Sequence, residues 1–312
     1  MKDGILNINK PAGMTSHDVI GDLRRLLGMK KIGHTGTLDP MATGVLPICL
    51  GKATRVAEYM DMDFKTYRCT MSLGVVTDTQ DIWGEVLELR DTTGITEAAV
   101  RAAFMPFRGE ISQLPPMYSA VRIDGRRLYD YARAGETDVV ADRVQPRRVY
   151  IRSLDIELID FAADSNVKKV TFVVECSKGT YIRTLCHDIG EALGCGGMLT
   201  ALRRTETLGF TTADCHTLEE LKQTSEEGRF EELLMPVDAA FRQYKSIFLS
   251  PKQSKMFLDG IRLDTNRIKI PAEGDTVRVY GDGRFLALAH IERSIAELQI
   301  IKLFYTKENP NC

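Results

Sequence analysis

The sequence contains the stretch Gly33-His34-Thr35-Gly36-Thr37-Leu38-Asp39-Pro40, followed by Thr43-Gly44-Val45-Leu46-Pro47. Proline restricts the residue before it to extended conformations, so Asp39 is predicted to lie on a stiff loop rather than in a helix. The surrounding glycines allow positive φ angles and the close approach of a ligand. A single carboxylate on such a loop suits a nucleophile or a general base. The same residues also suit an ordinary turn, because Gly, Asp and Pro are the commonest turn residues.

The composition is that of a globular protein with about two domains. The chain has 312 residues, of which 44% are apolar and 27% are charged. It has no apolar run long enough for a transmembrane helix, and its first residues, Met1-Lys2-Asp3-Gly4-Ile5-Leu6, are too polar for a signal peptide. Seven cysteines without a C-x-x-C pair argue against a zinc site or a disulfide framework. We therefore expect reduced thiols in a cytoplasmic protein that binds no metal.

The net charge of −2 conceals a basic segment. Residues 122–152 contain eight arginines against five acids, a local balance of +3. The arginines of this segment are Arg122, Arg126, Arg127, Arg133, Arg143, Arg147, Arg148 and Arg152. This asymmetry is typical either of a solvated surface or of a loop that faces RNA.

Hydrophobic patterning predicts an α+β fold. Alternating apolar and polar residues predict strands at 4–9, 65–75, 84–89, 149–159, 168–176 and 199–205. Helical spacing predicts helices at 15–27, 53–59, 97–104, 125–133, 182–193 and 218–234. After a boundary near residue 245, short strands at 267–270, 276–280, 284–290 and 298–304 predict a small β-barrel. We therefore expect one domain at 1–245, with an insertion near 112–150, and a second at 246–312.

Two further clusters suit binding to a nucleic acid. Lys10 precedes a Pro-Gly turn at the start of a predicted helix, where an anion is favoured, although an exposed lysine beside a capped helix gives the same pattern. Tyr67 lies on a predicted strand between Lys65 and Arg68, which suits stacking on a base. The alternative is a half-buried strand tyrosine.

Two arginine-containing segments complete the set. Arg183 begins a predicted helix, where its charge opposes the helix dipole unless an anion compensates it; the alternative is a surface arginine. Arg203 and Arg204 suit contact with a phosphate backbone, but on a strand they also suit opposite faces, with one arginine solvated and the other paired. The five histidines lack the spacing of metal ligands.

Taken together and in order, these segments resemble the TruB family of tRNA pseudouridine synthases. The resemblance covers most of residues 5–210 and is carried by segments 9–16, 33–46, 65–68, 113–120, 176–183 and 202–205. It implies a pseudouridine synthase core, with a mixed and largely antiparallel central sheet flanked by helices. The C-terminal residues are similar to the PUA-type barrel of bacterial members. One departure is Arg122, where many members have lysine, so the positive charge is kept.

The resemblance also implies a reaction and its residues. Members convert uridine 55 in the T loop of tRNA to pseudouridine without a metal or an organic cofactor. Asp39 matches the catalytic aspartate, and Tyr67 matches the tyrosine that packs on the flipped base. The remaining matches are Arg183, which pairs with the aspartate, the pocket residues Tyr181 and Leu202, His34, which helps the flipped T-loop bases dock, and Lys10, the basic residue of the first motif.

The chemistry needs a flipped base and an ionised carboxylate. Uracil cannot be reached inside a stacked loop, and stacking on Tyr67 would return about 1–3 kcal/mol of the cost of flipping. The carboxylate would attack C1′, attack C6 or take the C2′ proton, and Arg183 beside it would fix its rotamer. The arginines expected to contact the RNA backbone are Arg122, Arg126, Arg127, Arg147, Arg148 and Arg203. We expect a monomer with no protein partner that binds the T arm of tRNA; the alternative is a non-catalytic RNA-binding or tRNA-folding protein.

Overall fold

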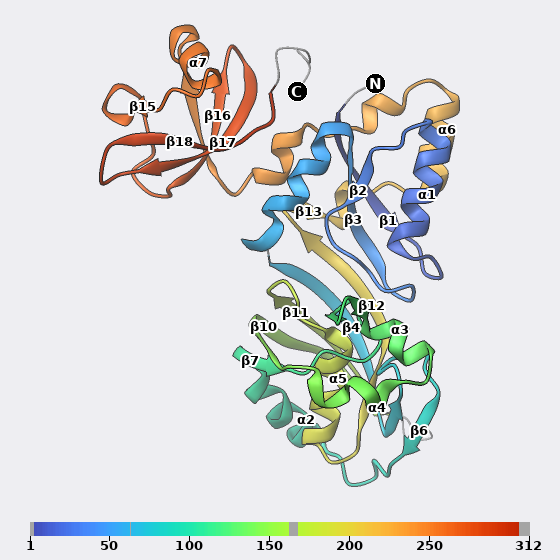
Figure 1. The fold of residues 1–312 in the computed structure, drawn as a ribbon. Helices are drawn as coiled ribbons and strands as arrows, with labels where there is room; N and C mark the ends of the chain where they lie inside the picture. The colour runs from blue at the N-terminus through green and yellow to red at the C-terminus, as the bar shows by residue number, and fades with distance from the viewer. Residues whose placement is uncertain (1–2, 63, 162–167, 306–312) are drawn as a thin grey trace. The chain divides into compact units, whose positions relative to one another are not determined.

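The structure is a computed structural model that describes residues 3–62, 64–161 and 168–305 (Figure 1). The described ranges leave out Met1 and Lys2 and the last residues of the expected C-terminal domain, 306–312, which include Cys312. The chain divides into two compact units. Unit 1 comprises residues 1–40, 44–60 and 208–312, and unit 2 comprises residues 41–43 and 61–207. No helix within the described ranges is long and apolar enough to span a membrane.

Unit 1 begins with a strand and a capped helix. Strand β1 (Gly4–Lys10) pairs antiparallel with β3 (Thr43–Leu50), and β2 (Ile32–His34) pairs antiparallel with β3. Helix α1 (Ser16–Leu27) has Thr15 as its N-cap in a capping box and ends at Gly28, which adopts a left-handed φ of 61°. These termini are where the sequence predicts them, because capping residues act locally.

Strand β3 is not predicted by the sequence. Pro47 lies within it, and proline argues against a central strand because it has no N–H to donate. Its carbonyl oxygen nevertheless accepts a hydrogen bond of 3.1 Å from the backbone N–H of Thr35. The proline therefore ties the start of the Asp39 loop to the strand that follows that loop. The predicted helix at 53–59 is part of a 3₁₀ helix, η1 (Gly51–Met62).

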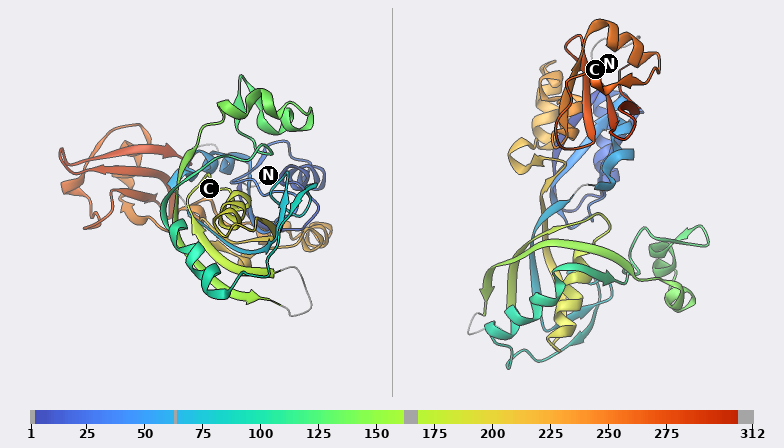
Figure 2. Two further views of the ribbon diagram at one scale, coloured as in Figure 1. Left: turned by 90° about the horizontal axis from the view of Figure 1, so that it is seen from below. Right: turned by 90° about the vertical axis from the view of Figure 1, so that its left-hand side faces the viewer.

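Unit 2 is built on an antiparallel sheet in the order β12-β4-β11-β10-β7. Its strands are β4 (Lys65–Leu73), β7 (Gly109–Gln113), β10 (Arg147–Asp160), β11 (Lys168–Cys176) and β12 (Gly197–Thr207). The sheet curves around helix α5 (Ile182–Ala192) (Figure 2). Helix α2 (Glu97–Phe104) packs on β11 through Phe104 and Phe172, whose ring centroids are 5.3 Å apart.

Two smaller substructures project from this sheet. A hairpin of β5 (Val75–Thr77) and β6 (Val86–Leu89) follows β4, and the 3₁₀ turn η2 (Met105–Phe107) follows α2. An insertion between β7 and β10 stands away from the sheet (Figure 2). It contains β8 (Arg122–Ile123), β9 (Arg126–Arg127), α3 (Leu128–Arg133), α4 (Thr137–Val140) and η3 (Ala141–Arg143). The insertion has its own small core of Leu128, Tyr131, Val140 and Val144.

Unit 1 resumes after β12 with short elements: β13 (Phe210–Thr211), η4 (Thr212–Asp214), α6 (Leu218–Glu226), η5 (Phe230–Leu233) and η6 (Val237–Phe241). The prediction of one helix over 218–234 is wrong, since α6 ends at Glu226. Gly228, with φ of 70°, breaks the helix, because that conformation cannot continue a right-handed turn. Only the 3₁₀ segment η5 follows.

The C-terminal residues form a five-stranded sheet in the order β14-β16-β17-β18-β15. Its elements are β14 (Lys245–Leu249), α7 (Pro251–Leu258), β15 (Leu263–Asp264), η7 (Thr265–Arg267), β16 (Thr276–Gly281), β17 (Arg284–Glu292) and β18 (Glu297–Leu303). The order of these described strands has two ends, so the sheet is open where the sequence predicted a barrel. The prediction of a strand at 267–270 is wrong, and β14 and α7 were not predicted.

The C-terminal sheet shares a core with the N-terminal strands of unit 1. Phe285, Leu288 and Phe304 belong to one buried cluster with Ile5 and Val45. A second buried cluster is formed entirely by residues between Ile247 and Leu298. The C-terminal sheet thus has a core of its own besides the shared cluster, and the domain boundary near residue 245 stays a prediction.

A glycine contact between α5 and β12 generates a stability prediction. A Cβ at Gly190 would lie 2.2 Å from the backbone nitrogen of Gly197, whereas a Cβ at Gly21 in α1 would meet nothing within 4 Å. We expect Gly190→Ala to lower the free energy of unfolding by about 1–3 kcal/mol through overpacking. The matched Gly21→Ala should raise it by about 0.5–1 kcal/mol, because alanine favours the helix. Urea unfolding measures both, and equal stability of the two variants would contradict the packing.

Candidate active site

The Asp39 loop is fixed on one side by the start of helix α1. Asp39 is half-buried between β2 and β3. Ser16, the first residue of α1, accepts a hydrogen bond of 2.9 Å at Oγ from the backbone N–H of Leu38. The same hydroxyl lies 3.2 Å from the Leu38 carbonyl oxygen, to which it can donate. The residue before Asp39 is thus held at its peptide N–H and at its carbonyl.

Lys10 fixes the loop on the other side. Its side chain is 0% exposed. The ammonium donates to the carbonyl oxygens of Pro40 at 3.2 Å, Pro11 at 2.8 Å and Met14 at 2.6 Å. The backbone N–H of Gly13 donates to the same Pro40 oxygen at 2.9 Å. A buried ammonium is tolerated when its three donors are bonded, so the expectation of an exposed lysine is wrong. These contacts favour a positioning role over direct contact with a phosphate.

The predicted site residues fall in different units. Lys10, His34 and Asp39 lie in unit 1, where His34 is half-buried at the end of β2, opposite Ile48. The other predicted residues lie in unit 2, and they include Tyr67, Tyr181, Arg183 and Leu202 as well as the arginines of the basic segment and Arg203. The pairing of Arg183 with Asp39 stays a prediction.

Tyr67 lies in the interior of the sheet of unit 2. It is 8% exposed and stands opposite Arg204 on β12 and Val174 on β11. Burial raises the pKa of Tyr67 to about 12, although the nearby Arg204 guanidinium, which hydrogen-bonds to it, acts in the opposite direction. The phenol is therefore neutral at physiological pH. Leu202, also buried, stands two residues before Arg204 on the same face of β12.

The neighbouring arginines point to opposite faces of β12. Arg204 is fully buried beside Tyr67, whereas Arg203 is exposed and stands opposite Arg68 on β4. Arg68 pairs with Glu157 at 2.7 Å on that outer face. The alternative in which the two arginines occupy opposite faces is confirmed, and only Arg203 is available to a ligand on the outer surface.

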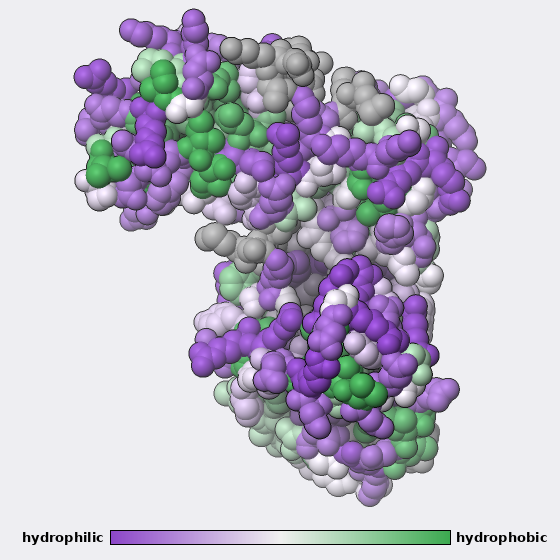
Figure 3. Space-filling view, viewed as in Figure 1, coloured by the Kyte–Doolittle hydropathy of each residue, from purple (hydrophilic) through white to green (hydrophobic). Residues whose placement is uncertain are grey.

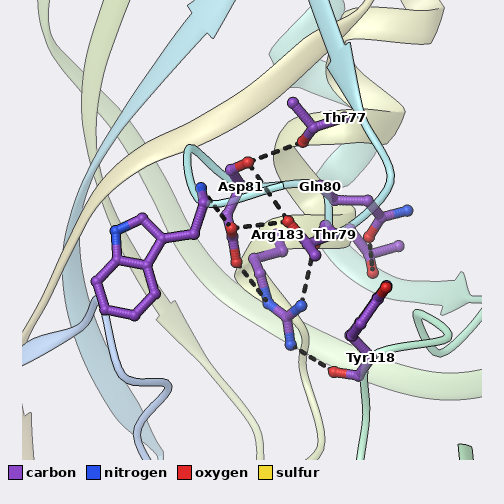
Figure 4. Close-up of polar contacts among 8 residues, drawn as sticks. Thr77, Thr79, Gln80, Asp81, Tyr118 and Arg183 are labelled. Carbon is purple, nitrogen blue, oxygen red and sulfur yellow. Dashed lines mark hydrogen bonds and ion pairs between the residues drawn. The ribbon is translucent and has the colours of Figure 1, made fainter. Parts of the chain in front are cut away.

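Arg183 lies in a cage of backbone and carboxylate oxygens (Figure 4). It is the second residue of α5 and is 5% exposed. Its Nη1 donates to the Thr79 carbonyl at 3.0 Å and its Nη2 donates to the Tyr118 carbonyl at 2.9 Å. Its Nε lies 3.7 Å from Oδ2 of Asp81, which is also buried. The expectation of an anion near this arginine is met within unit 2 by Asp81, and the alternative of a surface arginine is wrong.

The loop that carries Asp81 is held in a strained conformation. Gln80 has a φ of 62°, which is uncommon for a residue with a side chain. Its carbonyl accepts from the Leu199 N–H at 3.0 Å, and its Oε1 accepts from the Thr184 hydroxyl at 3.0 Å (Figure 4). Strain of this kind persists where surrounding contacts over-determine the backbone, commonly at functional sites.

Sequence reasoning missed several residues of this arrangement. Asp81 and Thr79 were not considered, and Tyr118 was quoted within the 113–120 segment without a role. The available signal was the polar run Asp78-Thr79-Gln80-Asp81 between two apolar strands and before Gly84. Tyr181 was assigned through its side chain, but its backbone is also fixed, because its N–H and carbonyl bond the side-chain amide of Gln113 at 3.0 and 3.2 Å.

The arginines of the basic segment differ in how exposed their side chains are and in which residues they contact. Arg126 pairs with Glu136 and lies over the Tyr131 ring at 4.2 Å, so it also stabilises the insertion. Arg127 lies over Tyr129 and is exposed, as are Arg122 and Arg147. Arg148 pairs with Glu110 at 3.1 Å, but its side chain is 82% exposed. Within the described residues, no group of three His, Cys, Asp or Glu side chains is arranged to hold a metal ion.

The buried phenol of Tyr67 generates a pH-dependent prediction. Because the folded-state pKa lies near 12 and the ordinary value is 10.0, the unfolded chain loses this proton first as the pH rises. The contribution of the buried phenol to the free energy of unfolding is therefore fully present below pH 10 and is lost as the pH rises to about 12. About 1.4 kcal/mol of it should be lost by about pH 11. Tyr67→Phe should lack this part of the alkaline loss. Urea unfolding near neutral pH and near pH 11 measures it, and an identical loss in both proteins would contradict the assignment.

Comparison with protein families matches two consecutive segments that together cover residues 24–242. Residues 24–182 match the model of the TruB family pseudouridylate synthase N-terminal domain, and residues 183–242 match the tRNA pseudouridylate synthase B C-terminal domain. The protein named tRNA pseudouridine synthase B of Clostridioides difficile (strain 630) is 41% identical over 292 residues, covering 93% of this chain and 94% of that protein. A protein of the same name from Burkholderia pseudomallei (strain 668) is 46% identical over 297 residues, covering 94% of each chain.

Solved structures agree with these sequence matches. A chain of the Cbf5-Nop10-Gar1 complex superposes with a TM-score of 0.72 at 26% identity, covering 98% of this chain and 86% of that chain. A chain of an H/ACA RNP bound to a substrate RNA containing 2′-deoxyuridine has the same TM-score at 24% identity, which shows a shared fold. The expected α+β pseudouridine synthase fold is thus confirmed. With the family model covering residues 24–182 and the relatives covering more than nine-tenths of the sequence, this chain belongs to the TruB family of pseudouridylate synthases.

Proposed function

We propose that this protein converts uridine 55 in the T loop of tRNA to pseudouridine. The observation that carries the proposal is the match to relatives named tRNA pseudouridine synthase B, which are 41% and 46% identical over 93% and 94% of the chain. The anchored Asp39 loop and the caged Arg183 support it, because a non-catalytic RNA-binding protein has no need of a carboxylate on a backbone held this firmly. That alternative is not favoured.

Asp39 is the proposed catalytic residue. Isomerisation must detach uracil from C1′, rotate it and reattach it through C5. One carboxylate can serve by attack at C1′, by attack at C6 or by removal of the C2′ proton. Each route needs the carboxylate in a fixed place, and the hydrogen bonds to Leu38 and Pro40 on either side of Asp39 restrain the backbone that carries it. No metal or organic cofactor is invoked.

The base-binding residues are proposed to come from unit 2. Tyr67 and Leu202 offer a buried surface against which a flipped uracil can pack, and stacking offsets part of the cost of flipping. Tyr181 and Arg183 stand at the start of α5, where Gln113, Thr79 and Tyr118 fix them. His34 is proposed to help the displaced T-loop bases dock. Lys10 is proposed to act through the Asp39 loop.

The T arm is proposed to contact arginines of the 112–150 insertion and of the sheet, most of which are exposed. Arg122, Arg126, Arg127, Arg147, Arg148 and Arg203 are the candidates for backbone contacts. Contacts of this kind give affinity that depends on salt and on RNA shape more than on sequence. We also propose that the C-terminal sheet is a PUA-like RNA-binding domain and that the protein acts as a cytoplasmic monomer on free tRNA.

Replacing the proposed catalytic carboxylate tests the reaction. Asp39→Asn keeps the size of the side chain and removes its charge, so release of tritium from tRNA labelled at C5 of uridine should fall by at least about 10²-fold. Affinity for tRNA should change by less than about threefold, because binding does not need the charge.

Asp22→Asn is the matched control. It is the same substitution in unit 1, at a half-exposed residue of α1 that pairs with Arg25 near the surface, and such pairs contribute little. Tritium release should be unchanged in this variant. If Asp39→Asn loses tritium release and tRNA binding equally, Asp39 has a structural role. If the wild-type protein binds tRNA but releases no tritium, the proposed enzymatic activity is refuted.

The basic segment is tested through salt dependence. Arg148→Gln should weaken tRNA binding and reduce the slope of log affinity against log salt by about 1, as expected for one lost phosphate contact. Arg25→Gln is the control, because Arg25 is 81% exposed, as Arg148 is 82% exposed, and both arginines pair with an acid. Filter binding over a range of salt concentrations gives both slopes. An unchanged slope for Arg148→Gln would remove this residue from the RNA interface.

A further inference from the structure

The β5–β6 loop presents an exposed indole. Trp83 is the single tryptophan of the 312-residue sequence, and its side chain is 57% exposed. Among the described aromatic side chains, none pairs with its ring. Tryptophan has a large apolar surface, and exposing it to water without a partner is unfavourable. This position therefore suggests a ligand.

The loop that carries Trp83 is rigid. The backbone N–H of Trp83 donates to Oδ1 of Asp81 at 3.0 Å, and Gly84 donates to the Asp81 carbonyl at 3.2 Å. Glu85 donates its N–H to Oδ1 of Asp78 at 2.8 Å. A Cβ at Gly84 would lie 2.3 Å from Oγ1 of Thr79, so the two sides of the loop are in close contact. A rigid backbone presents the indole at low entropic cost, as a binding residue requires.

The same loop holds Arg183. Asp81 binds the Trp83 N–H with Oδ1, and its Oδ2 lies 3.7 Å from Nε of Arg183. The Thr79 carbonyl binds the same guanidinium. The backbone of Trp83 is thus connected to the Arg183 side chain through one carboxylate, that of Asp81.

We propose that Trp83 stacks on an unpaired base of the substrate RNA adjacent to the uridine that is isomerised. The inference rests on the proposed function, which places Arg183 beside the flipped base. Flipping one nucleotide breaks its stack with the neighbouring bases and leaves a base face without a partner. Aromatic side chains bind such faces with little dependence on sequence. Trp83 therefore stabilises the RNA in the opened state that the reaction needs.

The surrounding apolar surface offers an internal comparison. Ile82, Leu87 and Leu89 are also exposed on this hairpin, and Figure 3 shows apolar surface in the region of β6. Aliphatic side chains have no ring face to stack on a base. A protein partner would use the whole apolar surface, whereas an RNA base would use the indole alone. The connection of Trp83 to Arg183 through the Asp81 carboxylate favours RNA, and the difference between the two kinds of partner gives the experiment its control.

The single tryptophan makes the test direct. Emission of the full-length protein, excited where tyrosine does not absorb, reports Trp83 alone. Titration with unmodified tRNA should quench this emission, with a midpoint that matches the affinity from filter binding. Unchanged emission at saturating tRNA would overturn the proposal and leave a protein partner as the occupant of the hairpin.

Variants separate stacking from general apolar contact. Trp83→Ala should weaken tRNA binding roughly 5- to 150-fold and raise KM for tritium release with kcat largely kept. Trp83→Phe should restore most of the affinity, because a ring face remains. Leu89→Ala, at a residue that is 76% exposed on the same hairpin, should leave affinity unchanged. Equal weakening by Trp83→Ala and Leu89→Ala, or no effect of Trp83→Ala in a protein with wild-type unfolding, would overturn stacking.

The two proposals fail separately. If the wild-type protein releases no tritium, the proposed reaction fails, and the emission titration still decides whether Trp83 contacts RNA. If release is normal and emission does not respond to tRNA, only the stacking proposal fails.

Discussion

A buried cation that binds backbone carbonyl oxygens organises the functional loop in each unit. In unit 1 the Lys10 ammonium binds the carbonyls of Pro11, Met14 and Pro40. In unit 2 the Arg183 guanidinium binds the carbonyls of Thr79 and Tyr118. Carbonyl oxygens supply partial negative charge without a titrating group, so each cation is stabilised while the loops that bear the carbonyls are fixed.

This arrangement explains why irregular segments can carry the proposed chemistry. A loop without secondary structure has backbone groups that would otherwise be satisfied by water, and it would move with that water. Here the loop carbonyls are bonded to side chains whose own positions are set by β1 and by α5. Removing either cation would remove these hydrogen bonds from partly buried carbonyl oxygens and release the loops that bear them. Rigidity at Asp39 and at Asp81 thus has the same physical origin.

Elements with local signals were predicted well. Helix α1 has its capping box at Thr15 and its stop at Gly28, and helix α2 and strand β11 have the predicted bounds, because capping and alternation are written in adjacent residues. Errors arose where a local signal opposed the tertiary arrangement. Pro47 concealed β3 in this way. The end of α6 is a different case, because Gly228 is itself a local stop signal that lay within a run of acidic helix formers. In the C-terminal sheet, β14 was missed because a five-residue strand next to a predicted domain boundary carries little pattern.

The sequence alone determined the kinds of group at the site, namely a carboxylate before proline, a strand tyrosine and an arginine at a helix start, because motifs fix residue identity and local backbone preference. It also determined the family through the order of those motifs. Only the tertiary structure decided what each group touches. Lys10 is buried against carbonyls, Arg183 is held by Asp81, and the indole of Trp83 is exposed on the same loop. Burial and partners depend on strands and loops that are distant in sequence, and no local pattern encodes which of them will meet.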